Sequence, residues 1–202
     1  DVIKLGGEIG KAEVVEGVKG KALLLPGRHV CRFPSSIIPV PEGTLTAWLR
    51  PTWKLRDLGT PRKRLLAVMN LKQKDKPIHR FNYVCFLGVS CGDEKKKIPH
   101  QLYCLALKSL HERGMLLMPD AAWEPNTWQH VAITWRFNTG KKDGSLIVYL
   151  NGKRIGRRTD FRANNIELGK FLQCAPDGAI DHLKIWDRIL TKNEIASEFA
   201  KN

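Results

Sequence analysis

The chain has 202 residues, of which 43% are apolar and 27% are charged, and these values are ordinary for a globular protein. The longest apolar runs, such as residues 146–150, are far shorter than the roughly 18–20 residues of a membrane-spanning helix, which argues against a transmembrane segment. Lys and Arg outnumber Asp and Glu by 34 to 20, and the formal net charge of +14 attracts nucleic acids, anionic lipids or acidic polysaccharides.

Short β-rich runs separated by turn signals follow one another along the chain. Residues 22–25 and 28–33 flank the turn pair Pro26-Gly27, and residues 44–50 alternate between apolar and polar side chains. Further runs of this kind lie at residues 65–71, 81–90, 101–107, 131–135 and 179–186. Many short strands with frequent turns favour an antiparallel β-sandwich or barrel.

The clearest local signal is a hairpin. Asn151-Gly152 lies between the apolar run 146–150 and the short run 153–155. An Asn-Gly pair between two β-rich runs indicates a type I′ turn, because both central residues of that turn need positive φ. The sequence therefore predicts a β-hairpin here.

The C-terminus has the only helical signature that we identify. Thr191 and Glu194 have the spacing of a capping box, and Leu190 and Ile195 occupy the positions of a hydrophobic staple. Phe199 follows Ile195 by four residues, so a short helix would present a single apolar edge. We expect this helix to dock on the β-structure.

Basic residues form short clusters, and the five cysteines have no zinc-type spacing. The basic clusters lie at residues 62–64, 72–76, 95–97, 141–142, 153–154 and 157–158. Each is read either as a solvated loop or strand edge or as part of a surface for anions. The cysteines are Cys31, Cys85, Cys91, Cys104 and Cys174, so at least one is unpaired within the chain. Cys85 and Cys104 are either cross-strand neighbours or buried small hydrophobes. A mixed Cys/His metal site with His79 and His100 is a further alternative.

Several sequence pieces, taken together and in order, resemble one known family. The pieces are residues 20–23 leading to Gly27, residues 43–51, residues 126–132, the hairpin VYLNGKRI at 148–155, residues 177–186, and residues 188–191 with Glu194-Ile195. They resemble the laminin-G-like, concanavalin-A-like jelly-roll family, whereas residues 50–125 match it poorly. The resemblance implies an all-β fold: an antiparallel two-sheet β-sandwich with a short C-terminal helix. We find no internal boundary and expect a single domain over residues 1–202.

Related sandwich folds include glycoside hydrolases and polysaccharide lyases, and each of these enzyme classes needs a characteristic set of residues. A glycosidase needs two carboxylates flanking the scissile bond, and Asp and Glu are sparse in the expected strands. A polysaccharide lyase needs a Tyr or His base and a group that neutralises a uronate. Candidates for those roles are His79, Arg80, Tyr83, His100, Gln101 and Tyr103, although no lyase signature is recognisable. We predict a non-catalytic protein and keep a lyase as an alternative.

A binding function requires aromatic faces and, for acidic sugars, cations. The candidate aromatic residues lie outside the matching motifs: Trp53, Tyr83, Tyr103 and Trp123. The candidate cations near them are Arg50, Lys54, Arg56, His79 and Arg80. Trp53 follows Pro51 closely, and it is either exposed or a core residue under a long loop.

The resemblance also implies a calcium option. Some members of the family bind calcium near the position of Asp181, and calcium prefers six to eight oxygen ligands. Asp177 or Glu8 would add oxygens, while His182 stands where an acidic neighbour is usual. The alternative is a carboxylate of Asp181 that pairs with a nearby Arg or Lys.

These observations lead to one main hypothesis: a secreted or cell-surface lectin-like module that binds an acidic polysaccharide or glycoprotein. It requires no cofactor, with calcium as an option at Asp181. A structural or adhesion domain of a larger surface or viral assembly is the first alternative, and a polysaccharide lyase is the second. We expect no specific nucleic-acid binding, because no helix-turn-helix, RNP-like pattern or zinc finger is present.

Overall fold

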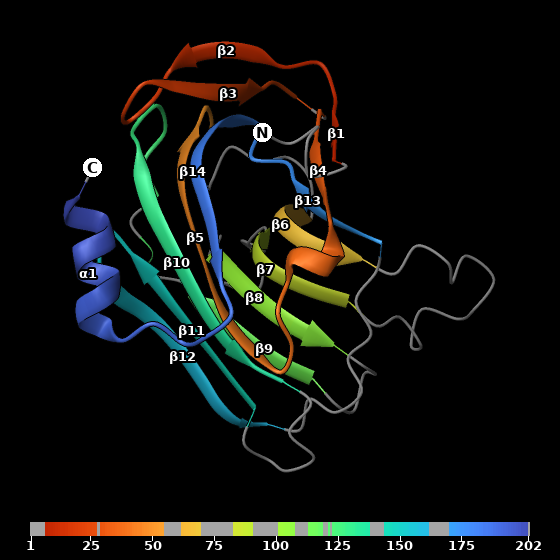
Figure 1. The fold of residues 1–202 in the computed structure, drawn as a ribbon, viewed down its shortest axis with the longest axis vertical. Helices are drawn as coiled ribbons and strands as arrows, with labels where there is room; N and C mark the ends of the chain where they lie inside the picture. The colour runs from red at the N-terminus through yellow and green to blue at the C-terminus, as the bar shows by residue number, and fades with distance from the viewer. Residues whose placement is uncertain are drawn as a thin grey trace, which may run out of the picture.

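The computed structural model describes residues 7–27, 29–54, 62–69, 83–90, 101–107, 113–118, 121, 123–137, 144–161 and 170–201. Within them, two antiparallel sheets of seven strands each pack face to face. Helix α1 (Lys192–Ala200) lies beside β10–β12 on the side away from the other sheet (Figure 1). The predicted two-sheet β-sandwich with a short C-terminal helix is confirmed.

The first sheet, sheet A, joins strands from the two ends and the middle of the chain. In spatial order it contains β1 (Glu8–Ile9), β4 (Cys31–Pro34), β13 (Phe171–Cys174), β6 (Arg62–Met69), β7 (Tyr83–Ser90), β8 (Gln101–Leu107) and β9 (Arg113–Met118). A short 3-10 helix, Ser35–Ile37, follows β4.

The second sheet, sheet B, holds the best-matching sequence motifs. In spatial order it contains β12 (Lys153–Phe161), β11 (Gly144–Leu150), β10 (Gln129–Arg136), β5 (Glu42–Pro51), β14 (Gly178–Trp186), β3 (Lys21–Leu25) and β2 (Glu13–Glu16). β12 and β2 are therefore its two edge strands.

The core lies between the sheets and follows from the alternation along their central strands. Leu45 on β5 and Ile133 on β10 are register partners and both are fully buried. Trp135, two residues further along β10, packs on Phe86 of sheet A with ring centroids 4.7 Å apart. A period of two thus puts one face of each strand into a shared apolar layer.

The β11–β12 hairpin forms as predicted. Asn151 and Gly152 have φ values of 50° and 73°, the left-handed backbone that this turn requires. The side-chain oxygen Oδ1 of Asn151 also accepts a 2.9 Å hydrogen bond from the backbone N–H of His130 on β10. The turn is therefore tied to the neighbouring strand as well as to its own hairpin.

Helix α1 begins at the predicted capping box. The hydroxyl of Thr191 accepts a hydrogen bond from the Glu194 N–H at 3.3 Å, and the Glu194 carboxylate accepts one from the Thr191 N–H at 2.7 Å. Ile195 is fully buried on the outer face of sheet B, and the Phe199 ring stacks on Trp48 at 5.6 Å. α1 has nine residues, and no described helix is long and apolar enough to cross a bilayer.

The structure bears on the two alternatives given for Cys85 and Cys104. Cys85 lies opposite Leu105 rather than Cys104 in the β7–β8 ladder. Cys104 is fully buried, as the small-hydrophobe alternative predicts. Among the cysteines that the structure describes, Cys31 and Cys174 are register partners across the β4–β13 ladder.

Candidate functional site

Two of the aromatic residues predicted to bind ligand are core residues. Trp53 and Trp123 are 8% and 5% exposed, and their ring centroids are 5.8 Å apart. The indole N–H of Trp53 donates to the carbonyl of Pro176 at 2.9 Å. The core alternative is therefore correct for Trp53, and the prediction that these two rings offer exposed faces for stacking is wrong.

Tyr103 is buried as well, at 3% exposure, because its ring packs directly on the backbone of Gly88. A side chain at Gly88 would overlap the Tyr103 ring, so the glycine permits this close approach. Tyr103 is therefore unable to present a stacking face, which corrects the prediction. Tyr83 begins β7 opposite Leu107.

Two of the predicted cations, Arg50 and Lys54, lie within the described residues. The guanidinium of Arg50 lies over the ring of Trp128, 5.0 Å from its centroid, and Lys54 is exposed. Arg56, His79 and Arg80 lie outside the described residues. Among the described members of the predicted set, Trp53, Tyr103 and Trp123 are buried.

The carboxylate of Asp181 accepts hydrogen bonds from two backbone N–H groups. Its Oδ1 accepts the N–H of His182 at 2.8 Å, and its Oδ2 accepts the N–H of Val18 at 2.9 Å. The carboxylate therefore ties the β2–β3 turn to β14, and its partners are backbone amides rather than the expected Arg or Lys.

The two carboxylates proposed to help Asp181 hold calcium are also engaged elsewhere. Asp177 accepts from the Gly27 N–H at 2.7 Å, and Glu8 pairs with Arg32 at 3.0 Å. The described residues contain no group of three or more His, Cys, Asp and Glu side chains placed to hold a metal. Since calcium needs several convergent oxygens, these residues do not fit a calcium site.

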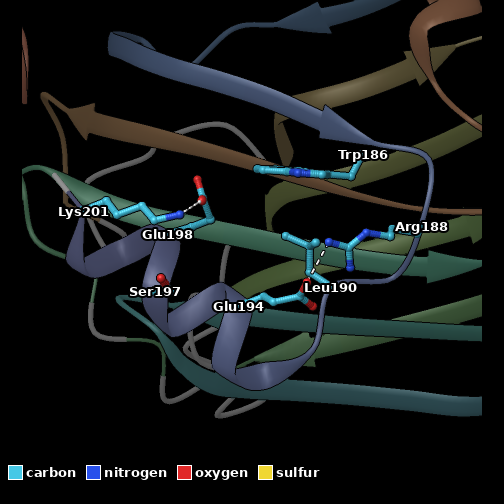
Figure 2. A pocket seen from close by; sticks show the side chains of 7 residues that line it. All are labelled: Trp186, Arg188, Leu190, Glu194, Ser197, Glu198 and Lys201. Carbon is cyan, nitrogen blue, oxygen red and sulfur yellow. Dashed lines mark hydrogen bonds and ion pairs between the residues drawn. The ribbon is translucent and has the colours of Figure 1, made fainter.

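Beside α1 lies a first hollow of about 170 Å³, the Trp186 hollow (Figure 2). Its lining residues are Trp186, Arg188, Leu190, Glu194, Ser197, Glu198 and Lys201. The charges that line it are paired with one another: Arg188 with Glu194 at 2.6 Å, and Glu198 with Lys201 at 3.0 Å and with Lys184 at 2.7 Å. An incoming ion would have to compete with these pairs.

The carboxyl groups of the Trp186 hollow are held in their ionised form. Hydrogen bonds from the Arg188 side chain and from Thr191 lower the pKa of Glu194 to about 2. Hydrogen bonds from Lys184 and Lys201 lower the pKa of Glu198. Neither group therefore carries a proton near neutral pH.

A second hollow of about 390 Å³, the hairpin hollow, lies between the β11–β12 turn and the start of α1. Its lining residues are Tyr149, Gly152, Lys153, Arg154 and Lys192. No ion pair joins Lys153, Arg154 or Lys192 to a carboxylate in the part of the chain that the structure describes. Three exposed cations thus border one depression without an internal counter-ion.

Strand β12 carries two further cations, one on each face of the sheet, because Arg157 lies opposite Ile147 and Arg158 lies opposite the buried Leu146. Arg157 and Arg158 are exposed and likewise have no described carboxylate partner. Arg154 and Arg157 lie opposite Tyr149 and Ile147, whose side chains pack with α1 on the outer face of sheet B. We call Lys153, Arg154, Arg157, Arg158 and Lys192 the cationic edge.

The cationic edge suits anions that carry several oxygens. Arg offers a planar fork of donors that matches carboxylate and sulfate groups, and Lys adds a mobile point charge. The basic pairs at 153–154 and 157–158 were visible in the sequence. Their position on an edge strand, and the approach of Lys192 from the helix, depend on tertiary contacts that no local pattern reports.

Comparisons with known proteins agree with the fold. Residues 107–196 match the family model of the Concanavalin A-like lectin/glucanases superfamily. A search of curated proteins finds no match to the chain. Among solved structures, domain 4 of AbnA, a GH43 extracellular arabinanase from Geobacillus stearothermophilus, superposes with a TM-score of 0.63 at 17% identity, covering 95% of this chain and 86% of that one.

Bacterial toxin binding domains are also similar. The binding domain of Paraclostridial Mosquitocidal Protein 1 has a TM-score of 0.65 at 16% identity, with 96% of this chain and 47% of that chain covered. The binding domain of Botulinum Neurotoxin DC, in complex with SialylT, has a TM-score of 0.63 at 14% identity, with 96% and 46% covered. The chain thus spans about half the length of these toxin domains, and identities this low establish the fold alone. The resemblance seen in the sequence is confirmed: residues 107–196 match the Concanavalin A-like lectin/glucanases superfamily, and the chain has the concanavalin A-like fold.

Proposed function

We propose that this chain is a non-catalytic carbohydrate-binding module for acidic glycans, and that the hairpin hollow with the cationic edge holds the ligand. The observation that carries the proposal is the set of exposed cations on β12 and at the start of α1 that have no described carboxylate partner. Such a surface keeps a positive potential that a polyanion can neutralise. Sulfated or uronic-acid polysaccharides present anionic groups along an extended chain. Such a chain can lie along an exposed strand edge and contact several of its cations.

The fold neighbours support a carbohydrate ligand in general. The arabinanase domain is described in complex with arabinotriose and as part of an extracellular enzyme, and one toxin binding domain is described in complex with SialylT. A secreted or surface location for this chain fits both cases. The preference for acidic glycans rests on the cationic edge and not on these neighbours.

The Trp186 hollow supports a function without glycoside cleavage. It contains two carboxylates beside an aromatic ring, which superficially resembles a glycosidase site. A glycosidase needs one carboxyl group with a raised pKa that can donate a proton to the leaving oxygen. Glu194 and Glu198 both have lowered pKa values, so neither is suited to that role.

Salt-gradient elution from immobilised heparin tests the proposal. Arg154→Ala with Lys192→Ala removes two cations of the hairpin hollow. Lys11→Ala with Lys19→Ala is the matched control, because it removes two exposed cations from the β2 side of sheet B. We expect the first variant to lose about a hundredfold in affinity and the control to stay within twofold, since each of the two lost charge-assisted hydrogen bonds contributes roughly 1.5 kcal/mol.

A panel of soluble ligands then separates glycan recognition from plain charge attraction. Chondroitin sulfate, polygalacturonate, double-stranded DNA and neutral dextran are compared at one ionic strength by calorimetry. Tighter binding to an acidic glycan than to DNA supports the proposal. Equal losses for both double variants, or equal binding to DNA, would show that the net charge alone is responsible. Ultraviolet absorbance from newly formed unsaturated uronates would instead reveal a lyase.

A further inference from the structure

The Trp186 hollow lies on a different face of α1 from the hairpin hollow. Four α1 residues with the spacing of one helix face line it: Glu194, Ser197, Glu198 and Lys201. The hairpin hollow instead receives Lys192, and its Gly152 lies next to Ala196 and Phe199. We propose that the Trp186 hollow binds one ring of a neutral sugar, which stacks on the indole of Trp186. This site is separate from the hairpin hollow and does not depend on the binding of acidic glycans there.

The indole of Trp186 is a supported apolar surface at the end of β14. It is half-buried and packs against the apolar cluster beneath α1 that contains Leu190 and Ile195. Figure 2 shows the ring edge-on beside the hollow, with the charged side chains of the hollow lying toward α1. Four of the other five tryptophans are buried: Trp48, Trp53, Trp123 and Trp135. A ring that packing already holds in place loses little freedom when a ligand covers its remaining surface.

The charges of the Trp186 hollow cancel one another. Two cations, Arg188 and Lys201, and two carboxylates, Glu194 and Glu198, are among its described lining residues. Arg188 pairs with Glu194 at 2.6 Å, and Lys201 pairs with Glu198 at 3.0 Å. A charged ligand would have to displace a partner from one of these pairs, which leaves another charge unpaired. The hollow therefore favours a ligand without charge, whereas the described lining of the hairpin hollow has three cations and no carboxylate.

Hydroxyl groups can use the hydrogen-bonding capacity that remains at these pairs. One oxygen of the Glu194 carboxylate accepts from the Arg188 side chain, and the other accepts from the Thr191 N–H. A carboxylate has about four lone-pair positions and a guanidinium has five N–H donors, so acceptors and donors both remain. A hydroxyl donates and accepts at once, and two neighbouring hydroxyls can contact the carboxylate and the guanidinium together.

The size and the lining of the hollow suit a single ring. Its volume is about 170 Å³, against about 390 Å³ for the hairpin hollow. Drug-sized ligands fill pockets of roughly 300–1,000 Å³, so a smaller group fits here. Trp186 and Leu190 supply apolar surface, and the charged pairs supply polar groups. A sugar ring carries C–H groups on its faces and hydroxyl groups around its rim, which matches this arrangement.

Nuclear magnetic resonance with neutral oligosaccharides tests the proposal. The β-1,4-linked tetraoses of glucose, xylose, mannose and galactose are titrated into the ¹⁵N-labelled full chain, and Trp186→Phe assigns the indole N–H signal of Trp186. We expect at least one tetraose to shift this signal with a Kd of about 1 mM, as a ligand held through one ring should. The Kd should change by less than about twofold between about 50 and 500 mM salt, because no charge is exchanged. Saturation transfer should be strongest at the C–H groups on one face of a ring.

Substitutions in and outside the hollow supply the controls. Trp186→Ala should weaken binding about tenfold or more, because it removes the aromatic anchor. Trp128→Ala removes another half-buried indole, which lies beneath Arg50, and should stay within about twofold. Ser197→Phe fills the hollow from an exposed position of α1 and should abolish binding without removing a core side chain. This variant keeps the test decisive even if Trp186→Ala fails to fold.

Three results would overturn the proposal: no binding of any tetraose at about 20 mM, a Kd that rises steeply with salt, or unchanged binding in Ser197→Phe. The double variant Arg154→Ala with Lys192→Ala separates the two hollows. It should keep the Kd for the neutral sugar within about twofold while it loses affinity for heparin. A parallel loss of both ligands would contradict two separate sites, whereas failure of heparin binding alone would leave the neutral-sugar site intact.

Discussion

The two edges of sheet B carry opposite charges. β12 contains four basic residues and a single acidic one, whereas the charged residues of β2 are Glu13 and Glu16. Charge of either sign discourages an edge strand from pairing with another sheet. Edge protection therefore does not explain why β12 is basic. The excess of cations there, next to a hollow and a helix, indicates a surface for an anionic ligand.

The edges also differ in how the rest of the molecule supports them. β12 faces β9 of sheet A through Gly156, whose missing side chain leaves room for Leu116 and Met118. β2 is held mainly by its hairpin partner β3 and by the contact between Val18 and Asp181. The cationic edge thus rests on the core, which fixes the spacing of its charges.

Charge reversal on β12 should have the largest effect. Arg154→Glu with Arg157→Glu removes two contacts to an acidic glycan and adds two repulsions, so affinity should fall about 1,000-fold. Calorimetric titration with a heparin oligosaccharide measures the change. Lys19→Glu with Lys11→Glu changes the net charge equally on the β2 side, and a comparable loss there would remove the distinction between the edges.

The second largest effect should be a loss of stability in acid, caused by a buried histidine on the α1 side of sheet B. His130 lies beneath Phe199, with ring centroids 6.0 Å apart, and burial lowers its pKa from 6.5 to about 4 despite the opposing charge of Glu198, while Lys184 lowers it further. Between these pH values the unfolded chain binds a proton that the folded chain does not. The stabilisation is therefore complete above pH 6.5 and is lost as the pH falls toward 4.

The expected loss of unfolding free energy from this one group is about 2–3 kcal/mol at pH 4.5. Urea unfolding at pH 7 and pH 4.5 measures it, with His130→Phe as the control that removes the titrating group. If the wild type and His130→Phe lose equal stability over this interval, the buried histidine is not responsible.

Substitutions that change side-chain packing should lower the free energy of unfolding by different amounts at the two edges, and this difference should be smaller than the effects above. A Cβ at Gly156 would lie 2.9 Å from Cγ of Met118 and 3.0 Å from Cδ2 of Leu116. Gly156→Ala should therefore lower the unfolding free energy by about 1–2 kcal/mol, because the two side chains can yield only in part. Val14→Ala on β2 alters a side chain that is 69% exposed and should change it by less than about 0.5 kcal/mol. Chemical denaturation of the two variants compares them directly, and equal losses would contradict the assigned support of β12.

The smallest effect should come from making β2 basic. Glu13→Lys with Glu16→Lys adds cations to an edge whose neighbouring hollow is lined by one lysine, Lys21, and by the carboxylate of Asp181. Heparin affinity should rise by less than about threefold, since screening limits the influence of distant charges at physiological salt. If this variant elutes from heparin only at a much higher salt concentration than the unsubstituted protein, then any basic edge on this protein is sufficient for binding.

The sequence predicted those parts of the fold that local physics controls. The alternation in β5 and β10, the positive-φ turn at Asn151-Gly152 and the capping box at Thr191 depend on residues within a few positions of one another. The site was predicted less well. Trp53 and Trp123 looked available because they lie outside the matching motifs, yet each fills the core against the other.

The sequence by itself determined the many-stranded β-structure, the hairpin, the C-terminal helix and the excess of positive charge, because periodicity, turn chemistry and composition are local or additive, whereas the two-sheet architecture was implied by the family resemblance. The tertiary structure alone decided which residues meet. It placed Lys192 beside Lys153 and Arg154, and it set Cys31 against Cys174. Such contacts depend on the strand order and register between distant segments. The packing of the whole core selects that order and that register.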